Sequence, residues 1–318
     1  MTRMRTQTSG LDRNTLFGFL AILLWSTTIA VIRSLSEQLG PLTAAACIYL
    51  VGGAVSLGLS FFSGNQWMQV RDLPRRYLIG CGALFVLYMF AVYLGIGLAT
   101  DRHQVLEIGL LNYLWPALTL LFSIPLLNKK PRPSLVPGTL MALFGVFLVL
   151  VQTSSISWIS FLKNVTSNPL AYFLGLVAGV SWAFYSNLSR RWGGARNDGA
   201  VPFFMLATGV LLFFLRPLHP EKTLWSLRAV LEMSFMSLVS VTAYVSWDIA
   251  MRKGNMVLVA ACSYFIPLFS TLVSSLYLRI SPGLTLWLGC GLIILGSLIS
   301  WNSMKDPIPT QPTKQTQT

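Results

Sequence analysis

Charged side chains are scarce in this chain. Asp, Glu, Lys and Arg make up 10% of its 318 residues, whereas they make up about a quarter of a typical soluble domain. Only two histidines are present, His103 and His219, and they lie in separate connections between apolar runs. Metal binding and histidine-based catalysis are therefore not expected. We expect neither enzyme activity nor a cofactor.

Cysteine is also rare, and no Cys-x-x-Cys spacing occurs. The four cysteines are Cys47, Cys81, Cys262 and Cys290, and each lies inside an apolar run. Buried, isolated cysteines of this kind are typical of reduced packing residues.

The formal net charge of +13 at pH 7 does not indicate a nucleic-acid partner. Binding to nucleic acid needs basic residues gathered on one face. Here the basic residues are divided among short connections between apolar runs, which is the pattern of membrane topology.

Apolar residues dominate instead. They make up 54% of the chain, and the mean hydropathy is +0.65. Because about 20 apolar residues cross the hydrocarbon layer as a helix, the sequence predicts an all-α membrane protein with ten transmembrane helices in a lipid bilayer. The predicted spans are 14–33, 41–62, 76–98, 103–127, 134–152, 169–189, 199–216, 228–251, 255–278 and 282–301.

Lys and Arg indicate the orientation of these spans. Most of the 23 basic residues fall in the set of connections that includes both termini. The other set carries Arg33, Arg102, Lys163, Arg216, Lys222, Arg228 and Arg279. Since the richer set is normally cytoplasmic, both termini are expected in the cytoplasm.

An internal repeat divides the chain. The matched pairs are Gly18 with Gly175 and Trp25 with Trp182 at 157 residues, Tyr88 with Tyr244 at 156, and Tyr113 with Tyr264, Pro116 with Pro267, Gly138 with Gly289 and Gly145 with Gly296 at 151. We expect a first half at 1–152, an extracytoplasmic connection at 153–168, a second half at 169–301 and a disordered cytoplasmic tail at 302–318. In the connection, Trp158, Phe161 and Leu162 predict an amphipathic piece on the membrane surface.

Each half has five predicted spans, an odd number, so the two halves should cross the membrane in opposite senses. Inverted repeats of this kind are a mark of secondary transporters, which hold substrate near the midplane between the halves. The sequence therefore predicts two inverted five-helix repeats around a central cavity.

The pattern Tyr-x-x-Pro occurs in the middle of two spans, at Tyr113 to Pro116 and at Tyr264 to Pro267. Proline lacks the N–H that would bond the carbonyl four residues back, here that of Asn112 or Ser263. A free carbonyl at bilayer depth is costly unless it faces protein or water. Both spans are therefore predicted to kink beside the cavity.

Three stretches resemble a known family. They are Trp25-Ser26, Glu107-Ile108-Gly109-Leu110-Leu111-Asn112-Tyr113-Leu114-Trp115-Pro116 and Ser263-Tyr264-Phe265-Ile266-Pro267. They resemble the bacterial aromatic amino acid exporters of the drug/metabolite transporter superfamily, EamA type. The resemblance implies a secondary transporter that exports aromatic and other neutral amino acids across the inner membrane by alternating access. A monomer is expected.

The expected substrate-binding residues follow from the kinks, the repeat and this resemblance. Aromatic rings can stack on a substrate ring and attract an ammonium group, and freed carbonyls, the Asn112 amide and tyrosine hydroxyls can hold the amino and carboxylate groups. The candidates are Trp25, Tyr88, Asn112, Tyr113, Trp115, Pro116, Trp182, Ser263, Tyr264 and Pro267.

Ionisable residues inside spans are functional candidates, but most have a partner in the sequence. Asp248 with Arg252, and Glu232 with Arg228, stand four residues apart and are expected to form structural ion pairs. His103 and Glu107 share one face of a span, where we expect a hydrogen bond at its outer mouth rather than a proton-coupling pair.

Other functions remain open on the same fold. An exporter of other small metabolites or of cationic aromatic drugs is the alternative, although no clear unpaired carboxylate is available for a permanent cation. A sugar-phosphate carrier would need basic residues at the midplane, where these spans have none. A receptor or scaffold would not need inverted halves.

The kink gives a first prediction. Pro116→Ala should restore a continuous helix and lower transport more than it lowers insertion into the membrane, because the freed carbonyl disappears while the apolar run is unchanged. Transport and the amount of inserted protein would be measured together. Unchanged transport would count against a role for the kink.

Overall fold

The computed structural model describes residues 12–62, 72–151, 158–194, 199–218, 221–278 and 283–304, and the regular elements in these ranges are all helices. They are α1 (Arg13–Leu39), α2 (Pro41–Phe62), the π-helix η1 (Tyr77–Cys81), α4 (Gly82–Gly97), α5 (Arg102–Asn112), α6 (Trp115–Leu127), α7 (Leu135–Val151), α8 (Trp158–Ser167), α9 (Pro169–Trp192), α10 (Val201–Leu215), the 3₁₀ turn η2 (Arg216–Leu218), α11 (Leu227–Lys253), α12 (Met256–Cys262), α13 (Phe265–Leu278) and α14 (Leu284–Ser303).

Within the described ranges, six helical segments are long and apolar enough to cross a membrane. They are Pro41–Leu59, Tyr77–Gly97, His103–Leu127, Pro169–Trp192, Leu227–Lys253 and Leu284–Ser303. The protein is therefore an all-helical, multi-pass membrane protein. The expected tail is not described beyond residue 304, and α14 continues two residues past the predicted end of its span.

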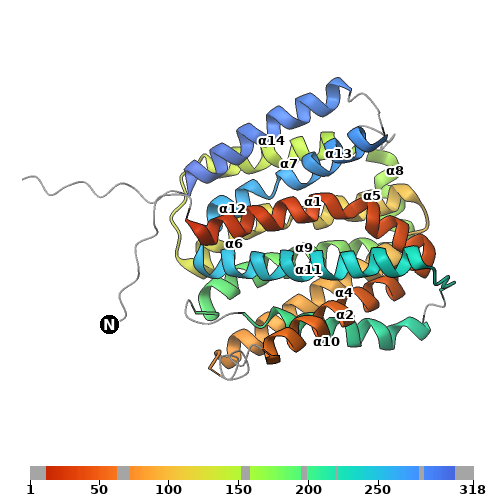
Figure 1. Ribbon diagram of the computed structural model, residues 1–318. Helices are drawn as coiled ribbons and strands as arrows, with labels where there is room; N and C mark the ends of the chain where they lie inside the picture. Colours follow the sequence, from red (N-terminus) through yellow and green to blue (C-terminus); the bar gives the residue numbers. More distant parts are fainter. Residues whose placement is uncertain are drawn as a thin grey trace, which may run out of the picture.

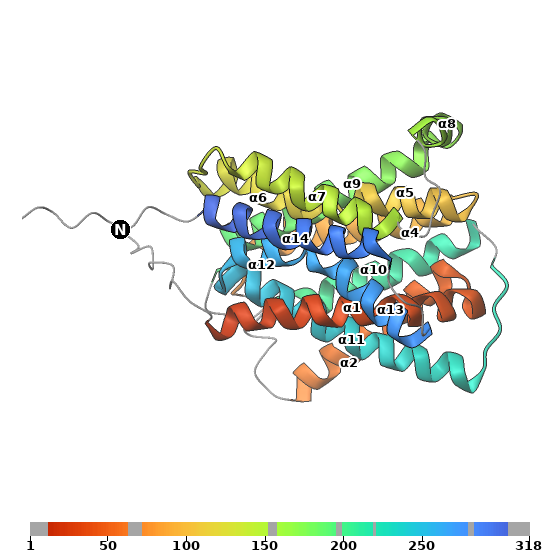
Figure 2. The ribbon, with the colours of Figure 1, turned by 90° about the horizontal axis from the view of Figure 1, so that it is seen from above.

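The long helices run side by side as one bundle (Figure 1), and α1 begins at the same end of the bundle at which α14 ends. We name this end the basic end, because Arg190, Arg191, Arg252 and Lys253 lie in the last turns of α9 and α11 there. The predicted amphipathic piece in 153–168 is the helix α8, which lies crosswise at the edge of the bundle (Figure 2). Its Ile159 is 81% exposed, as expected of a helix on a membrane surface.

Polar side chains fix where several helices begin. The Asp12 carboxylate accepts a hydrogen bond from the backbone N–H of Thr15 at 2.7 Å at the start of α1, and Asp101 accepts one from Gln104 at 2.9 Å at the start of α5. Ser226 and Asn255 cap α11 and α12 in the same way. Each cap satisfies a backbone donor that the helix itself leaves free.

Both predicted kinks are present, as complete breaks. The span 103–127 divides into α5 and α6 at Tyr113 and Leu114, and the span 255–278 divides into α12 and α13 at Ser263 and Tyr264. In both cases the proline falls in the first turn of the second helix, where its missing N–H costs nothing.

The two carbonyls that proline was expected to free are treated differently. The Asn112 oxygen faces α9, where a Cβ built on Gly179 would lie 3.0 Å from it. The Ser263 oxygen accepts a hydrogen bond from the N–H of Ile266 at 3.1 Å, so the expectation that it is free is wrong. The tight turn at the second break brings the N–H of Ile266 within hydrogen-bond distance of this carbonyl, and it replaces the N–H that Pro267 lacks.

Helix pairs join the two halves of the chain. α1 packs on α11 and α12, and α9 packs on α4 and α5. Gly18 of α1 lies against Val259, and Gly175 of α9 lies against Ile108. Ile108 and Val259 are themselves 151 residues apart, so the two contacts are related by the sequence repeat.

The pair α7 and α14 shows the same relation through glycines. A Cβ on Gly145 would lie 2.8 Å from the backbone nitrogen of Ile293, and a Cβ on Gly296 would lie 2.8 Å from the Cα of Ala142. Gly296 stands 151 residues after Gly145, and Ile293 stands 151 residues after Ala142, so the two contacts are related by the sequence repeat. Small residues allow such close approach of helices in a membrane.

Gly296→Ala is expected to destabilise the protein by about 1–3 kcal/mol, because its Cβ would meet backbone atoms of α7, which cannot move aside as a side chain can. Gly291→Ala on the same helix is the matched control, since a Cβ there meets nothing within 4 Å. Thermal unfolding of the purified variants in detergent would measure both. Equal unfolding temperatures would contradict the packing described for this pair.

Candidate functional site

The centre of the bundle is a cluster of aromatic rings around Trp182 of α9, whose side chain is 1% exposed. Its ring centroid lies 4.6 Å from Tyr88, 4.9 Å from Tyr185, 5.7 Å from Tyr244, 5.8 Å from Trp25, 6.0 Å from Phe85, 6.1 Å from Trp247 and 6.5 Å from Trp115. We call these eight residues the aromatic cluster. They come from α1, α4, α6, α9 and α11.

Helix geometry explains how α9 contributes two members. Trp182 and Tyr185 are three residues apart, so they share one face of the helix and their rings stack at an angle of 23°. Trp115 meets Trp182 and Trp247 edge-on, at 86° and 87°. Stacked and edge-to-face arrangements are the favourable ones for aromatic rings, so the cluster is a well-packed unit.

The repeat passes through the cluster. Trp25 lies 5.4 Å from Tyr244, and its mate Trp182 lies 4.6 Å from Tyr88, the mate of Tyr244. Trp25 and Trp182 also contact one another. Trp115 and Trp247 break the symmetry, because the residues 151 after Trp115 and 156 before Trp247 are Ile266 and Ala91.

Two buried polar atoms at the cluster lack hydrogen-bond partners among the described residues. They are Nε1 of Trp25, which is a donor, and Oδ1 of Asn112, which is an acceptor. The Asn112 side chain lies next to the Tyr88 hydroxyl, and both Tyr88 and Trp25 contact the Trp182 ring. Buried polar groups normally have partners, and a bound molecule is one way to supply them.

Exposure distinguishes the members. Trp115, Trp182 and Trp247 are buried, whereas Trp25 and Tyr88 are partly exposed, as is Asn112. A small molecule bound at the cluster could contact these partly exposed residues. Such a molecule would meet aromatic faces, one donor and one acceptor in a setting poor in competing polar groups.

The remaining predicted residues lie around the second break and beside the first. Tyr113 packs against the aromatic cluster and also against a second apolar cluster, formed by α7, α13 and α14. Tyr264 is buried in that second cluster, and the Ser263 hydroxyl donates to the Ala260 carbonyl at 2.6 Å. Pro116 and Pro267 begin α6 and α13. The structure thus brings Trp25, Tyr88, Trp115 and Trp182 together, with Asn112 and Tyr113 beside them.

Sequence reasoning missed Phe85, Tyr185, Tyr244 and Trp247 as members of the cluster. Tyr244 could have been found, because it is the repeat mate of Tyr88. Tyr185 could have been found from its position one turn after Trp182. Nothing in the sequence separates Phe85 or Trp247 from the many other aromatic residues of the spans.

At the basic end, Asp248 and Arg252 form a fully buried ion pair, as expected from their spacing. Arg252 Nε lies 2.7 Å from Asp248 Oδ2, and the two side chains are 0% and 1% exposed. The hydroxyls of Tyr77 and Tyr185 donate to Asp248 Oδ1 at 2.9 and 3.1 Å. We name these four residues the buried ionic network. It ties η1 of the first half to α9 and α11 of the second.

Buried charges are costly unless every partner is present, and here the partners are supplied by three elements. Arg252 Nη1 donates to the carbonyls of Gly193 and Gly194 at 3.2 Å. Beside it, Arg190 Nη1 donates to the carbonyls of Arg252 and Gly254 at 3.0 and 2.8 Å, and so satisfies the end of α11.

The two other carboxylates singled out have different surroundings. The expected ion pair is present: Arg228 Nε lies 2.8 Å from Glu232 Oε1, and the Arg228 side chain is largely exposed. Glu107 is buried, accepts a hydrogen bond from the Tyr172 hydroxyl and lies 3.2 Å from Asn164 Nδ2. His103 is exposed, so Tyr172 and Asn164, rather than His103, are the observed partners of Glu107.

Comparison with known proteins places this geometry in a family. The model of the EamA-like transporter family matches residues 13–151 and again residues 169–302. The protein named aromatic amino acid exporter YddG in Escherichia coli is 35% identical over 293 residues, which cover 91% of this chain and 97% of that protein. Its namesake in Salmonella typhimurium is 36% identical over 291 residues, with the same coverage.

A solved crystal structure supports the arrangement of the helices. Its chain is 30% identical to this one, the TM-score is 0.76, and the match covers 92% of this chain and 98% of that chain. The helical bundle and its buried aromatic site define a polytopic membrane transporter. More specifically, the chain belongs to the EamA-like transporter family.

Proposed function

We propose that this protein exports aromatic amino acids, and other neutral amino acids less well, across the membrane. The observation that carries the proposal is the aromatic cluster around Trp182, with the unpartnered Trp25 Nε1 and Asn112 Oδ1 beside it. The relatives in Escherichia coli and Salmonella typhimurium are named as aromatic amino acid exporters, which agrees with it.

The polar atoms match the two charged groups of an amino acid. Trp25 Nε1 can donate to the carboxylate, and Asn112 Oδ1 can accept from the ammonium group. The faces of Tyr88 and Trp25 attract the same ammonium through their negative quadrupole, and an aromatic side chain of the substrate stacks on the cluster. Tyr113 and Trp115 shape the wall, while Pro116 and Pro267 lie in the first turns of α6 and α13, directly after the two breaks. Ser263 and Tyr264 support the second break.

We infer that the chain crosses the membrane ten times, as two inverted halves at 1–152 and 169–301 joined by 153–168 outside the cytoplasm. The repeat-related contacts of Gly18 with Val259 and Gly175 with Ile108 support this. The broken spans α5–α6 and α12–α13 each count as one crossing. The basic end faces the cytoplasm by the distribution of Lys and Arg, and both termini, with the tail 302–318, lie there.

Transport then proceeds by alternating access, with the buried ionic network as the closure of the cytoplasmic side. The network links the two halves through the bond from Tyr77 to Asp248. Opening this end requires that bond to separate, whereas Tyr185 and Arg252 can stay with Asp248 because they lie in the same half.

Export of a permanent cation is less well supported. A cationic drug would need an unpaired carboxylate facing the aromatic cluster. Asp248, which follows Trp247 of the cluster, is already bonded to Arg252, Tyr77 and Tyr185.

The direct test is uptake into liposomes that contain the purified protein. Phenylalanine and tryptophan should be transported faster than threonine, and a viologen should not be transported. Repeating the assay with and without a pH gradient shows whether protons are coupled. Transport of the viologen with no transport of amino acids would overturn the proposed substrate class.

Trp25→Phe keeps an aromatic ring at this position but removes the indole N–H donor. The KM for phenylalanine should rise about tenfold or more, because a hydrogen bond to a charged group contributes about 1.5–3 kcal/mol. Trp287→Phe in α14 is the matched control, since that side chain is 57% exposed and far along the chain from the cluster. A KM equal to that of the wild type in Trp25→Phe would remove Trp25 from the site.

The closure is tested with the native thiol of Cys81, which is buried at the end of η1 beside the network. In a protein whose other three cysteines are replaced by alanine, Tyr77→Phe should speed labelling of Cys81 from the basic end about tenfold, because one bond to a charged acceptor between the halves is lost. Glu232→Gln, which alters an exposed ion pair instead, should leave the rate unchanged. Equal rates in all three proteins would contradict the closure.

A further inference from the structure

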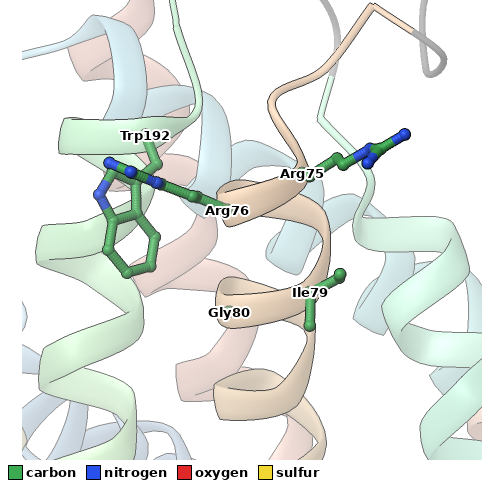
Figure 3. A pocket seen from close by; sticks show the side chains of 5 residues that line it. All are labelled: Arg75, Arg76, Ile79, Gly80 and Trp192. Atoms are coloured by element: carbon green, nitrogen blue, oxygen red, sulfur yellow. The ribbon is translucent and has the colours of Figure 1, made fainter.

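A surface pocket of about 500 Å³ opens at the basic end, between the start of η1 and the end of α9, away from the aromatic cluster. Its lining residues are Arg75, Arg76, Ile79, Gly80 and Trp192. Figure 3 shows the Arg76 side chain reaching toward the Trp192 indole, while Arg75 and Ile79 point to the other side of η1. The two arginines therefore flank a notch whose floor is Gly80.

The Trp192 indole can lie close against η1 because position 80 has no side chain. A Cβ on Gly80 would lie 2.7 Å from Cζ3 of Trp192, so the indole rests against the backbone of η1. Ile79 is 72% exposed beside it. One wall of the pocket is thus apolar and faces outward from the bundle, as a surface in contact with lipid tails would.

The charge of the pocket is strongly one-sided. Arg75 and Arg76 are both exposed, and in the described part of the chain neither forms an ion pair or a hydrogen bond through its side chain. No acidic residue lines the pocket. A tryptophan and two arginines at the end of an apolar span are the groups that lie at the headgroup level of a bilayer.

We propose that this pocket binds one anionic phospholipid of the cytoplasmic leaflet. The lipid headgroup rests beside Trp192 with its phosphate at Arg76, Arg75 on the other side of η1 adds a second positive charge near the headgroup, and an acyl chain follows Ile79. Pockets with basic residues between helices on the cytoplasmic side are suited to such headgroups through their positive charge. The site rests on the proposed orientation, but it is separate from the substrate site.

Native mass spectrometry of the full chain in detergent tests the site. Phosphatidylglycerol should bind with one tight site, and phosphatidylethanolamine of the same chain length should bind at least tenfold more weakly. Arg75→Gln with Arg76→Gln should weaken phosphatidylglycerol binding roughly 30-fold, since each basic residue near a membrane surface contributes about one kcal/mol. Arg75→Lys with Arg76→Lys should retain most of the binding, which separates loss of charge from misfolding.

Lys130→Gln with Arg132→Gln is the matched control. It removes two exposed positive charges from the connection between α6 and α7, at the same end of the bundle but outside the pocket, and should change the affinity less than twofold. Equal binding of the two lipids, or equal loss in both glutamine variants, would overturn the site. Displacement of phosphatidylglycerol by millimolar inorganic phosphate would show a free-anion site and would also overturn it. None of these outcomes depends on amino acid transport.

Discussion

A helix that is interrupted inside a membrane must hide its free backbone groups, and this requirement decides how the centre of the protein is packed. At the first break the Asn112 carbonyl is covered by Gly179 of α9. Gly179 stands three residues before Trp182, so the contact that covers the break also places Trp182 next to Trp115, at 6.5 Å. The covering of the break and the position of Trp182 in the aromatic cluster are thus set by a single helix contact.

The few charges of the chain follow the same requirement. Asp248 and Arg252 are almost completely removed from solvent, and they are tolerated because two tyrosine hydroxyls donate to the carboxylate and two backbone carbonyls accept from the guanidinium. Glu107 is held in a similar way by Tyr172 and Asn164. Exposed basic residues, in contrast, lie near the ends of helices, as Arg76 and Arg228 do, where water and lipid headgroups can solvate them.

Much of the helical architecture could be predicted from the sequence. The length of an apolar run and the position of a proline determine local structure, and a constant repeat offset can be read directly from the chain. The helical class, both breaks and the ion pairs Asp248–Arg252 and Glu232–Arg228 were predicted correctly. The partner of Glu107 and the bond to the Ser263 carbonyl could not be predicted, since they depend on how α8 and a tight turn are placed in space. The candidate site was found only in part for the same reason: a periodic pattern identifies the face of a helix, but not which of the other aromatic-rich helices that face meets.

The cluster does not share the symmetry of the repeat, because Trp115 and Trp247 correspond to Ile266 and Ala91. If the halves exchange conformations, a molecule held in the middle meets a different set of rings before and after the exchange. The affinity for that molecule can then differ between the two sides of the membrane. The concentration at which transport from each side saturates would differ as well. Detailed balance still forbids net flow without a gradient, so this inequality would adjust the working range of the carrier and leave its direction to the concentrations on either side.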